Sequence, residues 1–380
     1  MKMPSGRYVT CLNGYKAYIP DPLPPKINWD LPLVNSLSNA DSLLGRLAGE
    51  GGKLPNPHIL MRPFITREAV LSSQIEGTQA SLSDVLAAHA GASVQTNVND
   101  LKEVNNYIAA MQYGIERLNS LSLSLRLLRE IHAKLMVGVR GDHATPGEFR
   151  TTQNWIGVAG CTLTTATYVP PSPDYLMDCL GEFEKFLHIK TLPPLIQIAL
   201  AHYQFEAIHP FLDGNGRVGR LLITLFLVER KILPTPLLYL SAFFEATRQE
   251  YYDKLFAITK QGAWSEWILY FLNGIARQVE DALSRSSRIN ELLDAWRRQT
   301  AGLSSSVPNQ LIDHLAANPY LTIKQTSETM KISYTTIQRA IVKLEKLAII
   351  EEVSGSKRNR VYCAKAILKI LEEPAKIKGQ

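Results

Sequence analysis

Cysteine is scarce in this sequence. The 380 residues contain four cysteines, at positions 11, 161, 179 and 363, and no two of them form a C-x-x-C pair. Their spacing matches no zinc-binding pattern and gives no disulfide framework. We therefore expect reduced thiols and a cytoplasmic protein.

Long apolar runs are also lacking. The most apolar stretch, residues 221–228, is far shorter than the roughly 20 residues that a membrane-spanning helix needs. No apolar segment of a signal peptide follows Met1 and Lys2. Charged residues make up 20% and hydrophobic residues 46% of the chain, which excludes wholesale disorder. We expect a soluble globular protein with no membrane contact.

The net charge of +6 is unevenly distributed. Residues 301–380 contain 12 Lys or Arg against 7 Asp or Glu, so they carry most of the excess. A basic C-terminal segment after a nearly neutral body is a weak indication of contact with nucleic acid.

Apolar residues recur at helical spacing through most of the chain. We predict helices over residues 33–47, 58–76, 81–90, 101–119, 123–137, 174–189, 193–208, 218–231, 242–261 and 263–299. The segments 153–158 and 162–169 are rich in β-branched and aromatic residues and predict a small hairpin. The first thirty residues contain several prolines and predict an extended arm rather than a core element.

The most informative stretch, residues 209–220, reads His-Pro-Phe-Leu-Asp-Gly-Asn-Gly-Arg-Val-Gly-Arg. An unperturbed imidazole titrates near neutral pH, so His209 can accept a proton. The glycines let the backbone curl around a ligand, and free N–H groups before a following helix bind phosphate. The guanidinium groups of Arg217 and Arg220 can each donate two parallel hydrogen bonds to phosphate oxygens. Asp213 is a candidate metal ligand. The stretch predicts a site for a phosphate-rich nucleotide.

The same stretch contains Gly214, Gly216 and Gly219 at the spacing of a dinucleotide-binding fingerprint. That fingerprint requires a preceding strand and an acidic ribose ligand roughly 20 residues later. Residues 195–208 are instead alanine-rich and free of turn residues, which indicates a helix. This context excludes a Rossmann-type site.

The pattern His-Pro-Phe-x-Asp-Gly-Asn-Gly-Arg-x-x-Arg resembles the signature of the Fic family, whose members mostly transfer AMP from ATP to a hydroxyl group of a target protein. The resemblance implies that His209 deprotonates the attacking Ser, Thr or Tyr hydroxyl. It also implies that Asp213 holds Mg²⁺ against the phosphates and that Arg220 binds the γ-phosphate. The nucleotide-binding loop implied by the match consists of Asp213, Gly214, Asn215, Gly216, Arg217, Val218, Gly219 and Arg220.

Two further segments resemble family features around the nucleotide. Residues 165–171 are similar to a hairpin flap that aligns the target protein by strand addition, and the flap residues that we expect to approach the nucleotide are Thr165, Ala166, Thr167 and Tyr168. An ordinary surface hairpin is the alternative. Tyr251 resembles one of an aromatic pair near the adenine, although a tyrosine on an amphipathic helix is often a core residue.

Ser72, Glu76 and Gly77 resemble the inhibitory motif of the family, Ser/Thr-x-x-x-Glu-Gly/Asn. The spacing places Ser72 and Glu76 on one face of a helix, and Gly77 lets the chain leave it. The resemblance implies that Glu76 pairs with Arg220 and so removes the partner of the γ-phosphate. Two alternatives remain: a solvent-exposed Glu76, or one that positions water to remove AMP, as in some relatives.

The order of predicted helices and strands over residues 309–370 is typical of a winged helix-turn-helix. A helix over 309–317 is followed by one over 322–330 and by a third that Ser333 caps. Two strands, 349–353 and 360–363, flank a hairpin tip that we interpret as the wing.

The outward face of that third helix carries side chains that can reach bases or phosphates, namely Tyr334, Thr335, Gln338 and Arg339. The hairpin tip adds Lys357 and Arg358. Such modules bind DNA, dock onto proteins or form dimers, and the sequence leaves these partners open.

Together these features predict a mainly α protein, with a Fic-type helical bundle, a small β-hairpin flap and a C-terminal winged helix-turn-helix domain. We assign residues 1–115 to an N-terminal region with the inhibitory helix and 116–300 to the catalytic core. Residues 301–308 are a linker, and 309–372 form the winged-helix module.

The function that the resemblance implies is a self-inhibited protein adenylyltransferase that uses ATP and Mg²⁺ and also modifies itself. One alternative is a DNA-binding regulator whose Fic core acts as a sensor. Another is a Fic enzyme that removes AMP or transfers a different phosphate-containing group. A homodimer is also compatible with the sequence.

Overall fold

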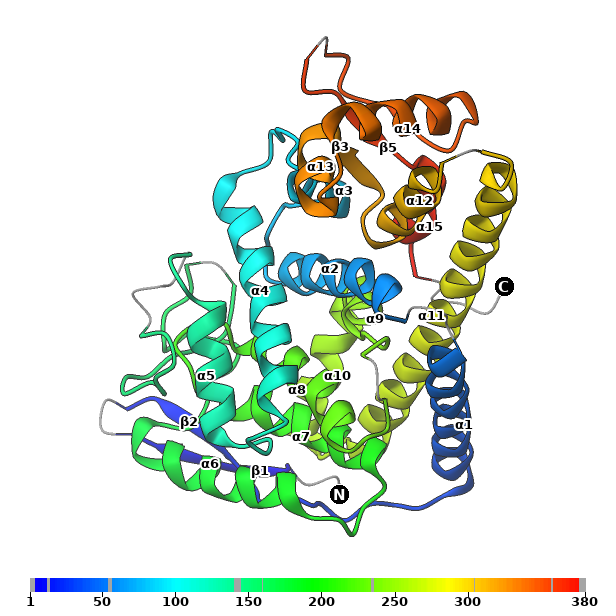
Figure 1. The fold of residues 1–380 in the computed structure, drawn as a ribbon. Helices are drawn as coiled ribbons and strands as arrows, with labels where there is room; N and C mark the ends of the chain where they lie inside the picture. The colour runs from blue at the N-terminus through cyan, green and yellow to red at the C-terminus, as the bar shows by residue number, and fades with distance from the viewer. Residues whose placement is uncertain are drawn as a thin grey trace.

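The computed structural model describes residues 4–11, 14–53, 57–139, 145–158, 160–233, 236–303, 305–356 and 358–375. The chain is mainly α-helical, as predicted, and its short strands form small antiparallel sheets (Figure 1). No described helix is both long and apolar enough to cross a membrane.

The predicted helices are present with ends that differ by a few residues. They are α1 (Leu31–Lys53), α2 (Pro57–Ile75), α3 (Leu82–His89), α4 (Val98–Arg117), α5 (Leu125–Leu135), α6 (Pro173–His188), α7 (Pro194–Ile208), α8 (Asn215–Glu229), α9 (Ser241–Ala246), α10 (Arg248–Gln261), α11 (Trp264–Thr300), α12 (Val307–Ala317), α13 (Ile323–Met330) and α14 (Tyr334–Lys346). The prediction of one helix over 242–261 is wrong, because Thr247 leaves the helical conformation between α9 and α10. Its hydroxyl donates to the carbonyl of Phe243 at 2.6 Å, which offers the backbone a local alternative to the helix.

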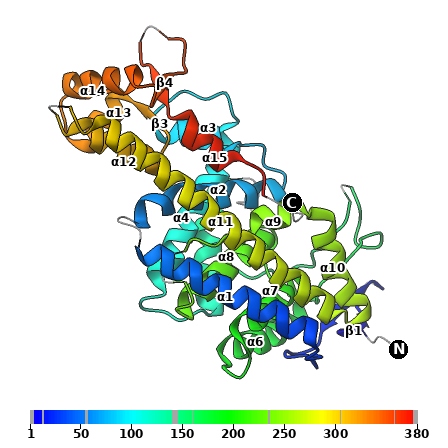
Figure 2. The same cartoon turned by 90° about the vertical axis from the view of Figure 1, so that its right-hand side faces the viewer.

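The long helix α11 runs the length of the molecule, and α1 lies alongside it (Figures 1 and 2). Its buried face includes the large side chains of Trp267 and Phe271. At its far end it reaches the C-terminal helices, so α11 links the helical core to the rest of the chain.

Helix α7 lies at the centre of the core. Apart from Pro194 and the half-buried Glu206, its side chains are buried, and it packs against α6, α8 and α11. A helix that is apolar all round belongs in the interior. The motif at 209–220 therefore begins at the end of a rigid, fully packed element.

The prediction of an extended N-terminal arm is wrong. Strands β1 (Gly6–Thr10) and β2 (Lys16–Pro20) form an antiparallel hairpin. The turn between them uses Gly14 at φ 78°, a conformation that glycine adopts without strain. Pro4 precedes β1 and the other prolines lie at or beyond the end of β2, so none interrupts a strand, and Tyr18 is buried.

The hairpin predicted over 153–158 and 162–169 is present only in a reduced form. Among the residues that the structure describes here, a single pair, Ile156 and Tyr168, exchanges backbone hydrogen bonds of 2.8 and 3.0 Å. The Tyr18 N–H of β2 donates to the carbonyl of Val169 at 2.9 Å, which ties the N-terminal hairpin to this segment.

The C-terminal elements follow the order helix α12, strand β3 (Tyr320–Thr322), helices α13 and α14, and strands β4 (Glu351–Glu352) and β5 (Val361–Cys363). The strands form one antiparallel sheet in the order β3-β5-β4. The expected caps are present, since Thr322 accepts from the N–H of Gln325 and Ser333 from that of Thr336. A further helix, α15 (Lys365–Glu372), was not predicted. These elements pack against α2, α3 and α11 (Figure 1).

Candidate active site

His209 follows the last residue of α7 in a left-handed conformation, with φ 50° and ψ 62°. Such a conformation is uncommon outside glycine and often marks a functional residue. The Nδ1 atom lies 3.3 Å from the carbonyl oxygen of Glu206. Because a carbonyl oxygen only accepts, Nδ1 carries the proton of the neutral ring and the lone pair is on Nε2. Nε2 is therefore the atom that can accept a proton from a substrate.

The ring of His209 is neutral at cellular pH. Burial lowers its pKa to about 4, and the guanidinium of Arg150 acts in the same direction. The hydrogen bond to the Glu206 carbonyl and the carboxylates of Glu76 and Asp213 oppose this shift without cancelling it. A neutral imidazole with a free lone pair is the form that a general base requires.

Two side chains that the sequence did not single out hold the backbone around His209. The Nε atom of Arg150, which is buried, donates to the carbonyl of His209 at 2.9 Å. The side-chain amide of Asn154 donates to the carbonyl of Phe211 at 2.8 Å. Both residues lie just before the flap segment, so the flap and the motif are fixed to each other.

Asn215 closes the loop between α7 and α8. Its side-chain carbonyl accepts from the N–H of Phe211 and its amide donates to the Phe211 carbonyl, each at 2.8 Å. Asn215 is buried, and this pair of bonds satisfies both of its polar ends. Its observed role is therefore to set the shape of the loop.

His132 on α5 supports the loop from the other side, and no motif in the sequence pointed to it. Its ring stacks on that of Phe211, with centroids 3.8 Å apart. The N–H of Gly147 donates to Nδ1 at 2.8 Å, so the proton of the neutral ring is on Nε2, which donates to the Asp213 carbonyl at 3.1 Å. Burial lowers the pKa of His132 to about 4, which keeps this arrangement uncharged.

Helix α8 begins directly after the loop and gives the site an anion-binding end. Gly214, at φ 76°, turns the chain into the helix, and its N–H donates to the Asp213 carboxylate at 2.6 Å. The Asp213 side chain is 49% exposed, so it is open to a ligand. The N-terminus of a helix attracts negative charge through its free N–H groups and its dipole. Val218 is fully buried, and its side chain therefore packs in the core.

Arg217 is buried, and some of its N–H donors make no hydrogen bond to the described residues. Its Nη2 lies 3.7 Å from the sulfur of Met136 and 3.7 Å from an Asp213 oxygen, and Nη1 lies 3.7 Å from Glu103. Its Nε and Nη1 atoms have no hydrogen-bond partner among the described residues. Buried guanidinium donors without partners fit a site for phosphate oxygens.

The predicted contact between Glu76 and Arg220 is present. The Nη2 atom of Arg220 donates to the Glu76 carboxylate at 2.7 Å, and it also donates to the Ser72 carbonyl at 2.8 Å. The Nε atom donates to the Ser72 hydroxyl at 2.8 Å. Gly77 follows at φ 98°, so the chain leaves α2 directly after this contact, as expected.

The Glu76 carboxylate also lies against the first turn of α8. A Cβ atom at Gly216 would collide with it, so any larger residue at this position would displace the Glu76 carboxylate. Burial alone would raise the pKa of Glu76, but Arg220, with smaller contributions from Arg217 and His209, holds it below the usual range. Glu76 is therefore ionised and occupies the place where an anionic ligand of α8 would bind.

Glu206, three residues before His209, is a second carboxyl near Arg220. Its Oε1 atom is buried and has no hydrogen-bond partner among the described residues. Burial raises the pKa of Glu206 to about 7, against the influence of Arg220. A Cβ atom at Gly219 would collide with this carboxyl, so the third glycine of the motif makes room for Glu206. The sequence pattern did not identify Glu206.

The prediction that Tyr251 contacts a nucleotide is not supported by its position. Its ring is 1% exposed and packs 4.5 Å from that of Phe244. Its hydroxyl lies 2.8 Å from Nε2 of His202, a buried histidine. Tyr251 therefore belongs to the aromatic core beneath the motif, while the neighbouring Tyr252 is 42% exposed.

The flap residues lie at the surface beside the motif. Thr165 and Thr167 are exposed and Ala166 is half-buried. Tyr168 instead anchors the segment, because its hydroxyl donates to the Ala207 carbonyl at the end of α7, at 2.6 Å. Large apolar side chains are exposed on the preceding segment, at Trp155 and Val158.

No cluster of three or more potential metal ligands occurs among the described residues. Asp213 offers an open carboxylate at the start of α8, while the Glu76 carboxylate nearby is paired with Arg220. A magnesium ion usually takes one or two carboxylates and completes its shell with water and substrate phosphates, so this single open carboxylate fits such an ion.

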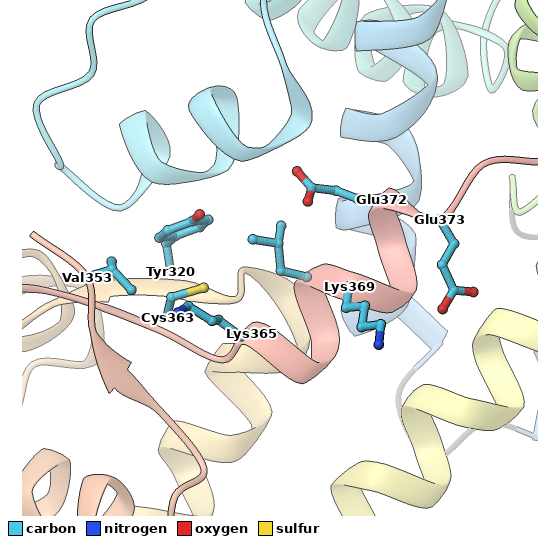
Figure 3. A pocket seen from close by; sticks show the side chains of 8 residues that line it. Tyr320, Val353, Cys363, Lys365, Lys369, Glu372 and Glu373 are labelled. Carbon is cyan, nitrogen blue, oxygen red and sulfur yellow. The ribbon is translucent and has the colours of Figure 1, made fainter.

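A pocket of about 480 Å³ lies elsewhere, in the C-terminal elements (Figure 3). Its lining includes Lys365 and Lys369 on α15 together with Glu372 and Glu373. Both signs of charge are present, so this pocket has no preference for a phosphate group. The motif at 209–220 remains the candidate active site.

Two protein-family models match this chain. The model described as Fic/DOC family N-terminal matches residues 34–116, which include Ser72 and Glu76, and the model described as Fic/DOC family matches residues 122–227, which include the motif. Among curated proteins, Protein adenylyltransferase Fic from Drosophila erecta is 33% identical over 137 residues, which are 35% of this chain and 26% of that protein. The chain therefore spans about a quarter of the length of the curated relatives that it matches.

Solved structures share the fold. A Fic family protein from Desulfovibrio desulfuricans G20 superposes with a TM-score of 0.61 at 22% identity, covering 94% of this chain and 100% of that one. Fic-1 from C. elegans superposes with a TM-score of 0.51 at 24% identity, covering 67% of this chain and 73% of that one. This chain therefore contains both Fic/DOC family domains in sequence order, and its fold is shared with solved Fic proteins.

Proposed function

We propose that this chain is a protein adenylyltransferase that transfers AMP from ATP to a Ser, Thr or Tyr hydroxyl of a target protein and of itself. The curated relatives that match its Fic region carry the name adenylyltransferase. The observation that carries the proposal is the neutral His209, whose free Nε2 lone pair lies at the end of α7, directly before the anion-binding start of α8.

In the proposed reaction, His209 Nε2 accepts the proton of the target hydroxyl. The hydroxyl oxygen forms a bond to the α-phosphorus of ATP, the bond to the bridging oxygen breaks, and pyrophosphate leaves. Negative charge beside an imidazole favours its protonated form. A bound nucleotide therefore raises the low pKa of His209 toward the working pH, where a base is most effective.

The phosphates of ATP bind the start of α8 and the arginines. The Nε and Nη1 donors of Arg217, which make no hydrogen bond within the described part of the chain, supply hydrogen bonds to phosphate oxygens, and Arg220 binds the γ-phosphate when Glu76 releases it. Asp213 would hold Mg²⁺, which neutralises charge on the phosphates when it is bound.

The target protein binds along the flap. Thr165, Ala166 and Thr167 lie beside the motif, and an exposed backbone edge can align an extended peptide through main-chain hydrogen bonds. The exposed Trp155 and Val158 add apolar contacts next to that edge.

Glu76 acts as an inhibitor in this proposal. Its carboxylate and the two oxygens of Ser72 occupy the guanidinium of Arg220, and the carboxylate also lies against the first turn of α8. ATP that binds without Arg220 lacks one anchor for its γ-phosphate, so its α-phosphate is not held in line with the attacking hydroxyl. The same Glu76 could instead position water for the removal of AMP.

A second candidate function concerns the C-terminal elements, which we assign to a winged-helix module. The order of helices and strands from α12 to β5 supports this assignment. Tyr334, Thr335, Gln338 and Arg339 are exposed on α14, and Arg358 and Arg360 are exposed beside the β4–β5 connection. Lys357 lies outside the described residues. These side chains support a DNA-binding regulator as the alternative function.

The test of the enzyme is direct. We would incubate the wild type and His209→Ala with Mg²⁺, a lysate and ATP labelled on the α-phosphate, with UTP and GTP in parallel. We expect labelled protein with ATP and the wild type only, and mass spectrometry would identify the targets. Equal labelling by His209→Ala would contradict the proposal, and preference for UTP would replace AMP with UMP.

For the second candidate, binding to duplex DNA should weaken steeply with added salt.

A further inference from the structure

A cluster of basic and polar side chains lies apart from the motif, where α2 and α3 meet the C-terminal elements (Figure 1). A cavity of about 110 Å³ separates these elements. It is lined by Arg62, His89, Ala90, His314, Asn318, Leu321, Thr322, Gln325, Thr326 and Thr329. The lining residues come from α2, α3, α12, β3 and α13, so a ligand here would touch several elements at once.

The titratable side chains that line this cavity are all basic. Arg62 is permanently cationic, His89 and His314 can be protonated, and none of the ten lining residues carries a carboxylate. Among the described residues, Arg62 makes no ion pair. Cationic groups that face a shared cavity repel one another, and an anion bound between them removes that repulsion.

Thr326 provides an independent observation. Its side chain is 1% exposed and lines the cavity, yet its hydroxyl has no hydrogen-bond partner among the described residues. Leaving a buried hydroxyl unsatisfied costs about 1–3 kcal/mol, so such groups normally have a partner. The other polar side chains of the lining are partly engaged, since Thr322 donates to the Ala90 carbonyl and Asn318 to the Leu86 carbonyl.

The cavity volume limits the ligand. It exceeds the roughly 30 Å³ that one water occupies and is smaller than an engineered cavity of about 150 Å³ that binds benzene. A group of a few heavy atoms therefore fits. Three potential cations and hydroxyl and amide donors around such a volume match the several oxygens of a tetrahedral anion.

We propose that this cavity binds a tetrahedral oxyanion, either inorganic phosphate or the phosphoryl group of a larger molecule, held by Arg62, His314 and Thr326. Water alone would satisfy the Thr326 hydroxyl, whereas an oxyanion would also accept charge-assisted hydrogen bonds from Arg62, whose side chain is partly exposed to solvent. A bound oxyanion joins α13 to α2, the helix that carries Ser72 near its other end. The inference is independent of AMP transfer.

Acid should strengthen the binding. Burial lowers the pKa of His314, and Arg62 adds to the effect; burial also lowers the pKa of His89, against its hydrogen bond with Asn105. The titratable groups that line the cavity are Arg62 on α2, His89 on α3 and His314 on α12, while β3 and α13 contribute none. An anion favours protonation of both histidines, so affinity rises as pH falls.

The experiment is a calorimetric titration of the full chain with sodium sulfate at constant ionic strength, at pH 8 and pH 6. Sulfate keeps its charge over this range, so a change in affinity reports on the protein. We expect saturable binding that is tighter at pH 6. Loss of a charge-assisted bond in Arg62→Ala should weaken it about tenfold or more, and loss of the hydroxyl in Thr326→Val about fivefold. Thr326→Val keeps the side-chain shape, so it remains informative if Arg62→Ala does not fold.

Two controls locate the site. Arg298→Ala removes an exposed arginine outside the cavity and should bind sulfate like the wild type. Arg220→Ala removes an arginine of the candidate active site and should also retain binding. No saturable binding, or binding that is lost in Arg220→Ala and kept in Arg62→Ala, would overturn the proposal. Titrations with phosphate and with methyl phosphate then distinguish the two proposed ligands. Binding of both compounds indicates the phosphoryl group of a larger molecule, and binding of phosphate alone indicates inorganic phosphate.

Discussion

The Glu76 carboxylate lies 2.7 Å from Nη2 of Arg220, which joins the C-terminal end of α2 to the first turns of α8. The Ser72 hydroxyl and carbonyl each accept a further bond from the same guanidinium at 2.8 Å. Burial would favour an uncharged Arg220, but the charge of Glu76 keeps its pKa raised. Two of the three guanidinium nitrogens, Nε and Nη2, are thus held by Ser72 on α2 and by Glu76, which directly follows α2.

Ser72→Ala should destabilise the chain, and Ser73→Ala should not. Ser72→Ala leaves the Nε donor of Arg220 buried without a partner, at a cost of about 1–3 kcal/mol in the free energy of unfolding. Ser73 is equally buried, but its hydroxyl has no hydrogen-bond partner among the described residues. Urea unfolding of both variants tests this, and equal losses of stability would contradict the role of Ser72.

Asn215→Ala should loosen the loop between α7 and α8. It removes two hydrogen bonds of 2.8 Å to the backbone of Phe211, which we expect to cost about 2 kcal/mol in the free energy of unfolding. Asn215→Asp keeps the acceptor but sets a buried carboxylate oxygen against the Phe211 carbonyl, so its loss of stability should be at least as large. Asn215→Asp as stable as the wild type would show that the donated bond contributes nothing.

The sequence predicted the contacts that a linear motif encodes. The resemblance of Ser72, Glu76 and the signature at 209–220 to the motifs of the Fic family implied the ion pair with Arg220, which is present. Helical periodicity also located most helices, because each buries one face or, in α7, all faces.

The sequence did not predict contacts that arise only when distant segments meet. His132 acts through the Asp213 carbonyl and the Phe211 ring, which come from another part of the chain. Glu206 matters because the fold buries it beside Arg220. The burial of Tyr251 depends on Phe244 and on His202, so its apolar helix position alone could not distinguish a core residue from a ligand contact.

His132→Phe should impair AMP transfer while the fold is retained. Phenylalanine keeps the stacking on Phe211 but loses the bond to the Asp213 carbonyl and the acceptor of the Gly147 N–H, so the loop that carries Asp213 is no longer fixed. We expect a decrease in kcat/KM of about tenfold or more, since small displacements of catalytic groups can cost up to about 100-fold. His188→Phe, at an exposed position, is the control. Unchanged transfer by His132→Phe would exclude the positioning role.

Acid should destabilise the chain partly through His202. Burial lowers the pKa of His202 to about 3, from an ordinary value of 6.5. Between these values the unfolded chain binds a proton that the folded chain does not, so stability is lost as pH falls, by up to about 1.4 kcal/mol per pH unit. In His202→Gln the free energy of unfolding should depend less on pH between 6.5 and 4. An unchanged slope would contradict the neutral, buried state of His202.

The contribution of Glu206 to the free energy of unfolding should change with pH in the opposite direction to that of His202. Burial raises the pKa of its carboxyl from 4.5 to about 7, so the folded chain keeps a proton that the unfolded chain has lost. Stability from this group is present below pH 4.5 and is lost as pH rises through 7. Glu206→Gln, which stays neutral, should gain stability relative to the wild type between pH 5 and pH 7. A constant difference over that range would show that Glu206 is ionised throughout.

The central claim is that Glu76 restrains an AMP transferase by occupying Arg220. It is tested most directly by the initial rate of self-modification with ATP labelled on the α-phosphate, for the wild type, Glu76→Gly and the double variant Glu76→Gly with His209→Ala. We predict that Glu76→Gly incorporates AMP about tenfold faster or more, because the guanidinium becomes free for the γ-phosphate, and that the double variant incorporates none. A rate for Glu76→Gly equal to that of the wild type, with label present in both, would contradict the restraint by Glu76.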